Sequence, residues 1–292
     1  MKLLVFGRSG QVATELRKQA YSRGILVDAL GRSEADLLDS AICAERVRET
    51  DADVIINAAA YTAVDKAEKE QDVARRINAD APGSMARAAA KRGLPFLHIS
   101  TDYVFDGSGE NARNTDDPTG PLGVYGRTKL DGEKQVAAAG GWHGILRTSW
   151  VFSAHGSNFV KSMLRLAETR EHLTVVADQI GGPTPAADIA ATLLDMAEKG
   201  ANVEDGVFHY AGAPDTSWAE FAREVFLQAD LNISVEDIPT SAYPTPAVRP
   251  KNSRLDCSRL ERTYGLSRPN WKAGLAEVLA QLGQIKNPSS KG

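Results

Sequence analysis

The stretch KLLVFGRSGQVA, Lys2–Ala13, decides the fold of this chain. Its first five residues form an almost continuous apolar run, which predicts a parallel strand buried on both faces. After this run, Gly7 permits a tight turn, Gly10 lets the backbone approach a pyrophosphate, and Ala13 allows close packing of a helix on the strand. Because the start of a helix offers free N–H groups and a positive dipole end, the stretch predicts a dinucleotide-binding turn.

Further apolar runs alternate with helical spacing through the first half of the chain. The predicted strands lie at 25–30, 53–57, 96–100 and 144–148. Alternation of strands and helices with short connections predicts an α/β fold with a Rossmann-type, doubly wound parallel sheet. Ligands of such sheets bind at the carboxyl ends of the strands, so the residues that follow each strand are the candidate site.

The regular alternation ends after Trp150, which predicts a second, smaller α/β unit that binds the substrate. We predict a cofactor-binding domain at 1–150 and a mainly substrate-binding domain at 151–283, with some elements returning to the first sheet. The polar residues 284–292 are expected to form a flexible tail.

The composition is that of an ordinary globular enzyme. Of its 292 residues, 42% are hydrophobic and 25% charged, and the net charge of −4 argues against a nucleic-acid partner. Cys43 and Cys257 form no C-x-x-C pair, which favours reduced thiols in a reducing compartment. The chain begins directly with a strand, and no apolar run approaches the ~20 residues of a membrane span. These features predict a cytoplasmic protein with no membrane association.

A tyrosine and a lysine share one face of a predicted helix after the fourth strand. In YGRTK, Tyr125 and Lys129 are one turn apart. The lysine charge is expected to lower the tyrosine pKa from about 10 and so make a proton donor for near-neutral pH. Thr101, at the end of the strand, can bind the same substrate oxygen, and a carbonyl held there would accept hydride from a dinucleotide. Because Y-x-x-x-K alone is most often a solvated helix face, the other motifs must support this interpretation.

The ends of the second and third strands indicate which cofactor binds. Arg32 and Ser33 stand where an NAD site usually has an acidic residue, and they suit the 2′-phosphate of NADPH. NADH stays possible, because Glu34 and Asp36 are close by. After Asn57, the small residues Ala58 and Ala59 would let a cofactor lie against the backbone, although a tight strand-to-helix turn also explains them.

Six strings in this order make the chain resemble the extended short-chain dehydrogenase/reductases and, within them, the dTDP-4-dehydrorhamnose reductases. They are NAAAYTAVDKAE from Asn57, STDYVFDG from Ser100, YGRTKLDGE from Tyr125, RTSWVF from Arg147, DQIGGPT from Asp178 and RPKNSRL from Arg249. The resemblance spans almost the full length. It implies NADPH-dependent reduction of the C4 keto group of dTDP-4-dehydro-L-rhamnose, in nucleotide-sugar and polysaccharide biosynthesis, by a monomer or homodimer.

The resemblance also implies a role for individual residues. Thr101, Tyr125 and Lys129 would be catalytic: Tyr125 would protonate the C4 oxygen, and Lys129 would also hold the nicotinamide ribose. The cofactor would contact Gly7, Gly10, Gln11, Val12, Arg32, Ser33, Ala58, Ala59 and Tyr61, with Tyr125 and Lys129. The sugar nucleotide would contact Val104, Trp150, Asn158 and Arg249. Trp150 can equally be a core residue at the domain junction, and Arg249 and Arg254 can either bind diphosphate or be solvated.

Three other interpretations are weighed against this one. Some relatives bind magnesium through glutamates, but Glu15 matches only one such ligand, so we predict no metal. Related dehydratases place an Asp-Glu pair after the threonine, whereas Asp102 is followed here by Tyr103, which argues against a dehydratase or epimerase. A non-catalytic, NADP-binding regulatory subunit stays an alternative, although the intact catalytic set argues against it.

Overall fold

A six-stranded parallel sheet forms the centre of the computed structural model, which describes residues 1–284. Its strands are β1 (Lys2–Phe6), β2 (Leu26–Leu30), β3 (Val54–Asn57), β4 (Phe96–Thr101), β5 (His143–Thr148) and β10 (Gly206–His209). They are ordered β10-β5-β4-β3-β1-β2, and every neighbouring pair is parallel. The predicted doubly wound parallel α/β sheet is therefore confirmed.

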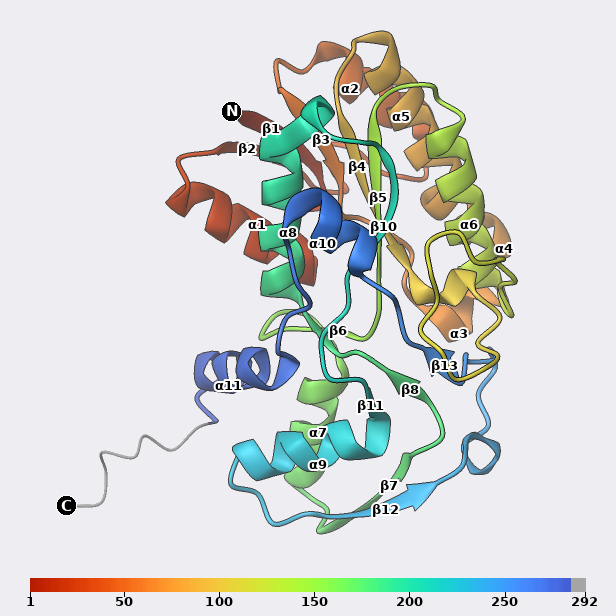
Figure 1. Ribbon diagram of the computed structural model, residues 1–292, viewed down its shortest axis with the longest axis vertical. Helices are drawn as coiled ribbons and strands as arrows, with labels where there is room; N and C mark the ends of the chain where they lie inside the picture. The colour runs from red at the N-terminus through yellow and green to blue at the C-terminus, as the bar shows by residue number, and fades with distance from the viewer. Residues whose placement is uncertain (285–292) are drawn as a thin grey trace, which may run out of the picture.

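Helices cover both faces of this sheet (Figure 1). On one face lie α1 (Gln11–Ser22), α8 (Ala186–Lys199) and α10 (Ser258–Tyr264), and on the other lie α2 (Ser40–Glu49), α5 (Ala81–Lys91) and α6 (Val124–Ala137). Successive residues of β1 alternate between the two cores: Leu3 and Val5 pack with the first set, and Leu4 and Phe6 with the second. Both faces of β1 are buried, as its apolar run predicted.

The order of the strands reverses between β1 and β3. The chain places β2 on one side of β1 and then crosses to place β3 on the other side. At such a switch point the connections after the two strands leave in opposite directions and open a crevice beyond their carboxyl ends. In this chain the crevice lies after Phe6 and Asn57, which are paired in register.

A smaller unit lies beneath the sheet in the view of Figure 1. It contains α7 (Phe159–Ala167), α9 (Trp218–Gln228) and α11 (Trp271–Gln281), with the parallel pair β7 (His172–Val176) and β12 (Ser234–Ile238). Its core includes Phe152, Phe221 and Trp271, all at most 1% exposed. Five short strands pair with one another outside the main sheet: β6 (Val151–Phe152) with β9 (Thr184–Pro185), and β8 (Ile180–Gly181) with β11 (Thr216–Ser217) and β13 (Asn252–Ser253).

Several elements after residue 150 return to the large sheet, α10 among them. Strand β10 pairs with β5 at the edge of the sheet, and helix α8 packs against α1. The predicted tail at 284–292 lies outside the described residues apart from Gln284. No helix within residues 1–284 is both long and apolar enough to cross a bilayer.

The alanine-rich segment that follows α3 (Val64–Ala67) is divided into three parts. It consists of α4 (Gln71–Arg75), a π-helical turn η1 (Arg76–Asp80) and then α5. Pro82 has no backbone N–H to donate to the carbonyl of residue 78, so the regular helical ladder cannot continue through this point. The Asn78 side chain is fully buried and accepts a hydrogen bond from the Tyr61 N–H (2.8 Å). The turn thus fixes the segment that follows β3.

Candidate active site

A cleft of about 840 Å³ runs along the carboxyl ends of β1, β3, β4 and β5. Of the predicted site residues, it is lined by Gly7, Gly10, Gln11, Val12, Arg32, Ala58, Ala59, Tyr61, Thr101, Tyr125, Lys129 and Trp150. Ser33, Val104, Asn158 and Arg249 are not part of its wall. The wall also contains Arg8, Asp102 and Thr148, which the sequence analysis did not assign to the site.

The N-terminus of α1 opens into this cleft. Gly10 precedes the helix and has no side chain with which to cap its first N–H groups. A Cβ atom on Gly10 would meet no atom within 4 Å, whereas on Gly7, with φ +116°, it would lie 3.4 Å from the Ala58 carbonyl group. Free N–H groups beside open space suit a phosphate or pyrophosphate, so this end of the cleft fits the diphosphate of a dinucleotide.

The Gln11 side chain turns towards the smaller unit. Its Oε1 accepts hydrogen bonds from Ser153 Oγ and from Asn158 Nδ2, both at 2.9 Å. Asn158 in turn precedes α7, and its Oδ1 accepts from the Lys161 N–H (3.2 Å). The predicted substrate residue Asn158 therefore acts here as a helix cap and as a tie between the two units, and it does not line the cleft.

Two arginines lie at the far end of the cleft, near the carboxyl end of β2. Arg32 is exposed, with its Nε 4.0 Å from an Asp36 oxygen. Arg8 pairs with Glu34 (2.7 Å) and donates to the Ala29 carbonyl (2.7 Å). The Ser33 hydroxyl donates to the same Glu34 carboxylate (3.0 Å), which turns it away from the cleft. Arg8 is part of the string that predicted the turn, but sequence reasoning assigned Gly7, Gly10, Gln11 and Val12 of that string to the cofactor and not Arg8.

Thr101 and Tyr125 meet where β4 and α6 converge. Thr101 ends β4 and is 5% exposed; its Oγ1 accepts from the Tyr103 N–H (3.2 Å) and donates to Asp102 Oδ1 (3.1 Å). Tyr125 lies in the first turn of α6, half-buried, with its ring edge-on to Tyr103 at 5.4 Å between centroids. The adjoining helix start is held by Glu68, which accepts the Val124 N–H (2.8 Å).

The pKa of Tyr125 corrects one expectation from the sequence. This pKa is raised to about 12, mainly by burial; a hydrogen bond with Thr101 opposes the rise, and the Asp102 charge contributes to it. Lys129, which was expected to lower it, instead points to β4: its Nζ donates to the Ile99 carbonyl (2.7 Å) and lies 3.1 Å from His98 Nε2. The i, i+4 spacing places both residues on one face, but contacts with β4 decide where the lysine points.

Lys129 is the group of this pair whose pKa lies nearer neutrality. The side chain is 2% exposed, and burial lowers its pKa to about 8, while the charge of Glu133 opposes that shift. A buried ammonium loses hydration, so its neutral form becomes accessible at physiological pH. The lysine is therefore suited to exchange protons under conditions in which the tyrosine stays protonated.

Two buried oxygens on the cleft wall have no hydrogen-bond partner among residues 1–284. They are Asp102 Oδ2 and Thr148 Oγ1. Asp102 is 2% exposed, and burial raises its pKa to about 6, although the Ser253 and Thr101 hydroxyls oppose the rise. Unsatisfied buried polar atoms are rare, so their presence on a cleft wall indicates a polar ligand. Thr148 ends a predicted strand and Asp102 lies two residues beyond another, which was the available signal for finding them.

Trp150 lies both on the cleft wall and at the junction of the two units. It lines the cleft, and its ring stacks on Trp218 with 3.6 Å between centroids and 10° between planes. It also packs against the core of the smaller unit. Its φ of +51° lies in the left-handed region, which is uncommon for a large side chain and is found mainly at functional sites.

Val104 and Arg249 do not face the cleft. Val104 is fully buried among Phe105, Leu255 and neighbouring apolar residues, because the short turn η2 (Asp102–Val104) directs it into the protein. Contact between its side chain and a substrate is therefore not possible in this structure. The Arg249 guanidinium pairs with Asp65 at 2.9 Å, which ties the RPKNSRL string to the segment after β3.

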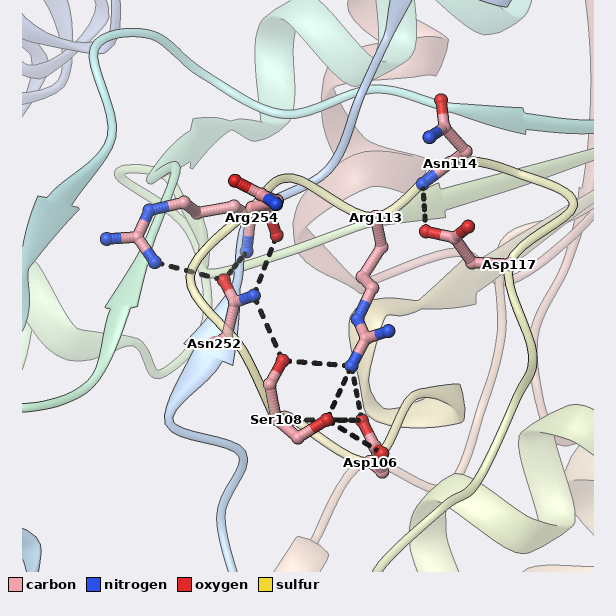
Figure 2. Close-up of polar contacts among 8 residues, drawn as sticks. Asp106, Ser108, Arg113, Asn114, Asp117, Asn252 and Arg254 are labelled. Atoms are coloured by element: carbon pink, nitrogen blue, oxygen red, sulfur yellow. Dashed lines mark hydrogen bonds and ion pairs between the residues drawn. The ribbon is translucent and has the colours of Figure 1, made fainter.

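The remainder of the RPKNSRL string holds the loop that follows β4 (Figure 2). Asn252 donates through Nδ2 to the carbonyl of Ser108 (3.4 Å) and accepts at Oδ1 from Arg254 Nη1 (3.1 Å). The Arg113 N–H donates to the Arg254 carbonyl (2.9 Å). Arg254, which was expected either to bind diphosphate or to be solvated, thus makes internal contacts here.

The buried carboxylate of Glu15 contacts a histidine side chain. It is 3% exposed, and its carboxylate lies 2.9 Å from His155 Nε2. Within residues 1–284, no three His, Cys, Asp or Glu side chains gather closely enough to hold a metal ion.

Comparison with known proteins shows relatives over nearly the whole chain. Residues 1–284 match the family described as RmlD substrate binding domain. The chain is 47% identical to dTDP-4-dehydrorhamnose reductase of Sinorhizobium fredii, over 93% of this chain and 94% of the relative. It superposes on crystal structures of dTDP-4-dehydrorhamnose reductases from Clostridium acetobutylicum (TM-score 0.92, 37% identity, 97% and 100% coverage) and from Bacillus anthracis in complex with NADP (0.89, 32%, 96% and 99%).

Proposed function

Because the chain belongs to the dTDP-4-dehydrorhamnose reductases of the RmlD substrate binding domain family, we propose that Thr101, Tyr125 and Lys129 carry out that reaction here. The protein reduces the C4 keto group of dTDP-4-dehydro-L-rhamnose to give dTDP-L-rhamnose, with NADPH as cofactor. The product is an activated sugar for polysaccharide biosynthesis. The resemblance found in the sequence is thereby confirmed.

One observation carries the assignment of the catalytic residues. Thr101, Tyr125 and Lys129 line the same cleft as the uncapped N-terminus of α1. A diphosphate held at α1 by the N–H groups after Gly10 places the rest of a dinucleotide along the strand ends, towards Tyr125. NADPH, when bound, supplies the hydride.

The chain itself supplies the proton and the orientation. The Thr101 and Tyr125 hydroxyls bind the C4 oxygen, and Tyr125 donates its proton as negative charge develops there. With a pKa of about 12, Tyr125 is fully protonated at physiological pH. It gives up its proton to an alkoxide, which is a stronger base than a phenolate. Asp102 and Thr148 supply the unpaired oxygens that can accept or donate hydrogen bonds to sugar hydroxyls.

The preference between NADPH and NADH rests on the two arginines near β2. Arg32 is exposed at the cleft, and Arg8 lies beside it with its guanidinium shared between Glu34 and a carbonyl. A guanidinium binds a phosphate group bidentately. We expect Arg32, with Arg8, to bind the 2′-phosphate of NADPH; NADH would forgo that contact but can still occupy the cleft.

The cellular setting is also part of this proposal. Cys43 and Cys257 are both free and buried, which suits a reducing compartment, and we infer the cytoplasm. We expect no partner beyond the dTDP-sugar and the cofactor, apart from a possible second copy of the chain.

Consumption of NADPH with dTDP-4-dehydro-L-rhamnose tests the proposal. The expected result is substrate-dependent loss of NADPH absorbance, with dTDP-L-rhamnose formed in equal amount; the reaction without sugar nucleotide is the control. A protein that binds NADPH, as shown by quenching of tryptophan fluorescence, but consumes none would support the non-catalytic regulatory alternative instead.

A further inference from the structure

A line of three buried side chains connects β3, β4 and α6 behind Tyr125. Asn57 at the end of β3 and His98 in β4 are fully buried, and Lys129 is 2% exposed. Asn57 Nδ2 lies 3.1 Å from His98 Nδ1, and His98 Nε2 lies 3.1 Å from Lys129 Nζ. The reaction described above gives neither Asn57 nor His98 a role.

A backbone amide fixes the direction of these hydrogen bonds. The Ala59 N–H lies 3.2 Å from Asn57 Oδ1, and a backbone N–H can only donate. The oxygen of the Asn57 amide therefore faces Ala59, and its NH₂ group faces His98. His98 Nδ1 must accept from that NH₂ group, so the single proton of a neutral imidazole is on Nε2.

This tautomer determines what Lys129 can be. His98 Nε2–H points at Lys129 Nζ, which must offer a lone pair to accept it. An ammonium group has three N–H donors and no lone pair, whereas a free amine has one lone pair and two N–H bonds. One of these N–H bonds accounts for the donation to the Ile99 carbonyl at 2.7 Å. The two contacts of Nζ are thus compatible with a free amine, whereas an ammonium would oppose a donor with a donor at His98.

A doubly protonated imidazole does not resolve the conflict. Its Nδ1–H would face the Asn57 NH₂ group, so two donors would again oppose each other. Burial, the largest influence on His98, also holds its pKa well below the usual value. His98 is therefore neutral, with its proton on Nε2.

The other charged groups around Lys129 are already engaged. Glu133, one turn further along α6, receives Arg147 Nη2 at 2.7 Å and also binds the Ser100 hydroxyl. Its charge opposes the loss of the lysine proton but does not prevent it, since burial has the larger effect on this pKa. Asp102, in η2, acts on Tyr125.

We propose that Asn57 and His98 are positioning residues that hold Lys129 as a free amine whenever it points to β4. A consequence follows that rests on the proposed function. After Tyr125 has given its proton to the C4 oxygen, protonated Lys129 passes one proton from Nζ to the phenolate oxygen. The resulting amine is the species that His98 Nε2–H binds, and solvent returns a proton to Nζ before the next turnover. Asn57 and His98 thereby favour proton release from the lysine.

Carbon-13 NMR of the ligand-free protein, labelled at lysine Cε, tests the proposal directly. Lys129→Met identifies the resonance that belongs to Lys129. In the wild-type protein that resonance should titrate near the pKa of about 8, well below the value of about 10.4 that is usual for lysine. His98→Gln should raise the midpoint by at least about one pH unit, because the glutamine can turn its amide oxygen to Nζ and bind the ammonium form.

Asn57→Asp provides a second, nearly isosteric variant. A carboxylate oxygen facing His98 places the imidazole proton on Nδ1, so that Nε2 accepts from the lysine; the Lys129 midpoint should again rise. His172→Gln is the matched control, because that histidine is on the exposed surface of β7 with 55% of its side chain accessible. Its substitution should leave the Lys129 midpoint unchanged.

The proposal is overturned if wild-type Lys129 titrates with the other lysines. It is also overturned if the midpoint stays in place in every variant that circular dichroism shows to be folded. A rise in a folded variant, with the control unmoved, supports it. Because the titration uses neither cofactor nor substrate, its outcome is independent of the NADPH consumption assay, and failure of one is distinguishable from failure of the other.

Discussion

Replacement of Glu133 by glutamine should destabilise the protein by about 3–5 kcal/mol, because it leaves a buried arginine without its counter-charge. The side chains of Glu133 and Arg147 are each 4% exposed. Arg147 Nε and Nη2 reach the two carboxylate oxygens at 3.0 and 2.7 Å, and the Ser100 hydroxyl donates to the same carboxylate. The amide matches the carboxylate in volume, so the change removes charge and leaves the packing intact.

The remaining contacts of Arg147 cannot compensate for this loss. Its guanidinium lies 5.1 Å from the centre of the Phe105 ring, a contact that contributes about 0.5–2 kcal/mol and is present before and after the substitution. A glutamine can accept from only one of the two guanidinium N–H groups and turns its own NH₂ towards the other. At about 2–4 °C per kcal/mol, the expected loss lowers Tm by roughly 6–20 °C.

Urea denaturation followed by circular dichroism measures the effect, with Glu220→Gln as control. Glu220 pairs with Arg223 on the surface, with 63% of its side chain exposed, so its substitution should change the free energy of unfolding by at most about 1 kcal/mol. The double variant Glu133→Leu, Arg147→Met should recover part of the loss, since no buried charge remains. A Glu133→Gln protein as stable as the Glu220→Gln control would refute the reasoning.

Four further outcomes are expected. Tyr125→Phe should lower kcat by about 100-fold or more while NADPH binding by fluorescence is retained, and unchanged kcat would remove the tyrosine as proton donor. Arg32→Ala should raise the Kd for NADPH much more than that for NADH; equal effects would contradict the 2′-phosphate assignment. Burial raises the pKa of Asp102 to about 6, so the folded protein holds that proton more tightly than the unfolded chain and loses stability as the pH rises from about 4 to about 6. Asp102→Asn should therefore be more stable than wild type by roughly 3 kcal/mol in urea denaturation at pH 8 but not at pH 4, and a constant difference across that range would argue against it. Gly132→Ala should cost about 1–3 kcal/mol, because its Cβ would lie 2.1 Å from the Asn78 carbonyl oxygen; an unchanged Tm would show that α6 can shift without cost.

The fold was largely predictable because near-continuous runs of apolar residues identify its buried strands. Lys2–Phe6 has apolar side chains on both faces of the strand, a pattern expected of a strand that is covered on both sides. Val54–Asn57 has the same pattern. Pro82 accounts for a break in the helical ladder, but the π-helical form of the turn at Arg76–Asp80 was not predictable. That turn places the Asn78 side chain in hydrogen bonds with Tyr61 and Thr128, which are distant in the sequence.

The candidate site was predictable where motif and strand end coincide. Gly7 follows a strand, Thr101 ends one and Tyr125 lies in the first turn of a helix, and all three line the cleft. The direction of Lys129 was not predictable, because His98 approaches it from a neighbouring strand. Val104 was assigned only by resemblance; the one-turn helix that buries it has no periodic pattern long enough to reveal which way a side chain faces.

The return of β10 to the large sheet constrains how the molecule can be dissected or can move. The backbone leaves that sheet after Thr148 and re-enters it at Gly206, while α8 has already crossed back to pack on α1 (Figure 1). A fragment that ended at residue 150 would lack β10, the strand that pairs with β5. It would also lack Ile189 and Leu193 of α8, so the apolar residues of α1 in the same core would be exposed. Residues 1–150 are therefore not expected to fold as an independent domain. Any movement of the smaller unit relative to the large sheet must therefore change the backbone in several connecting segments at the same time.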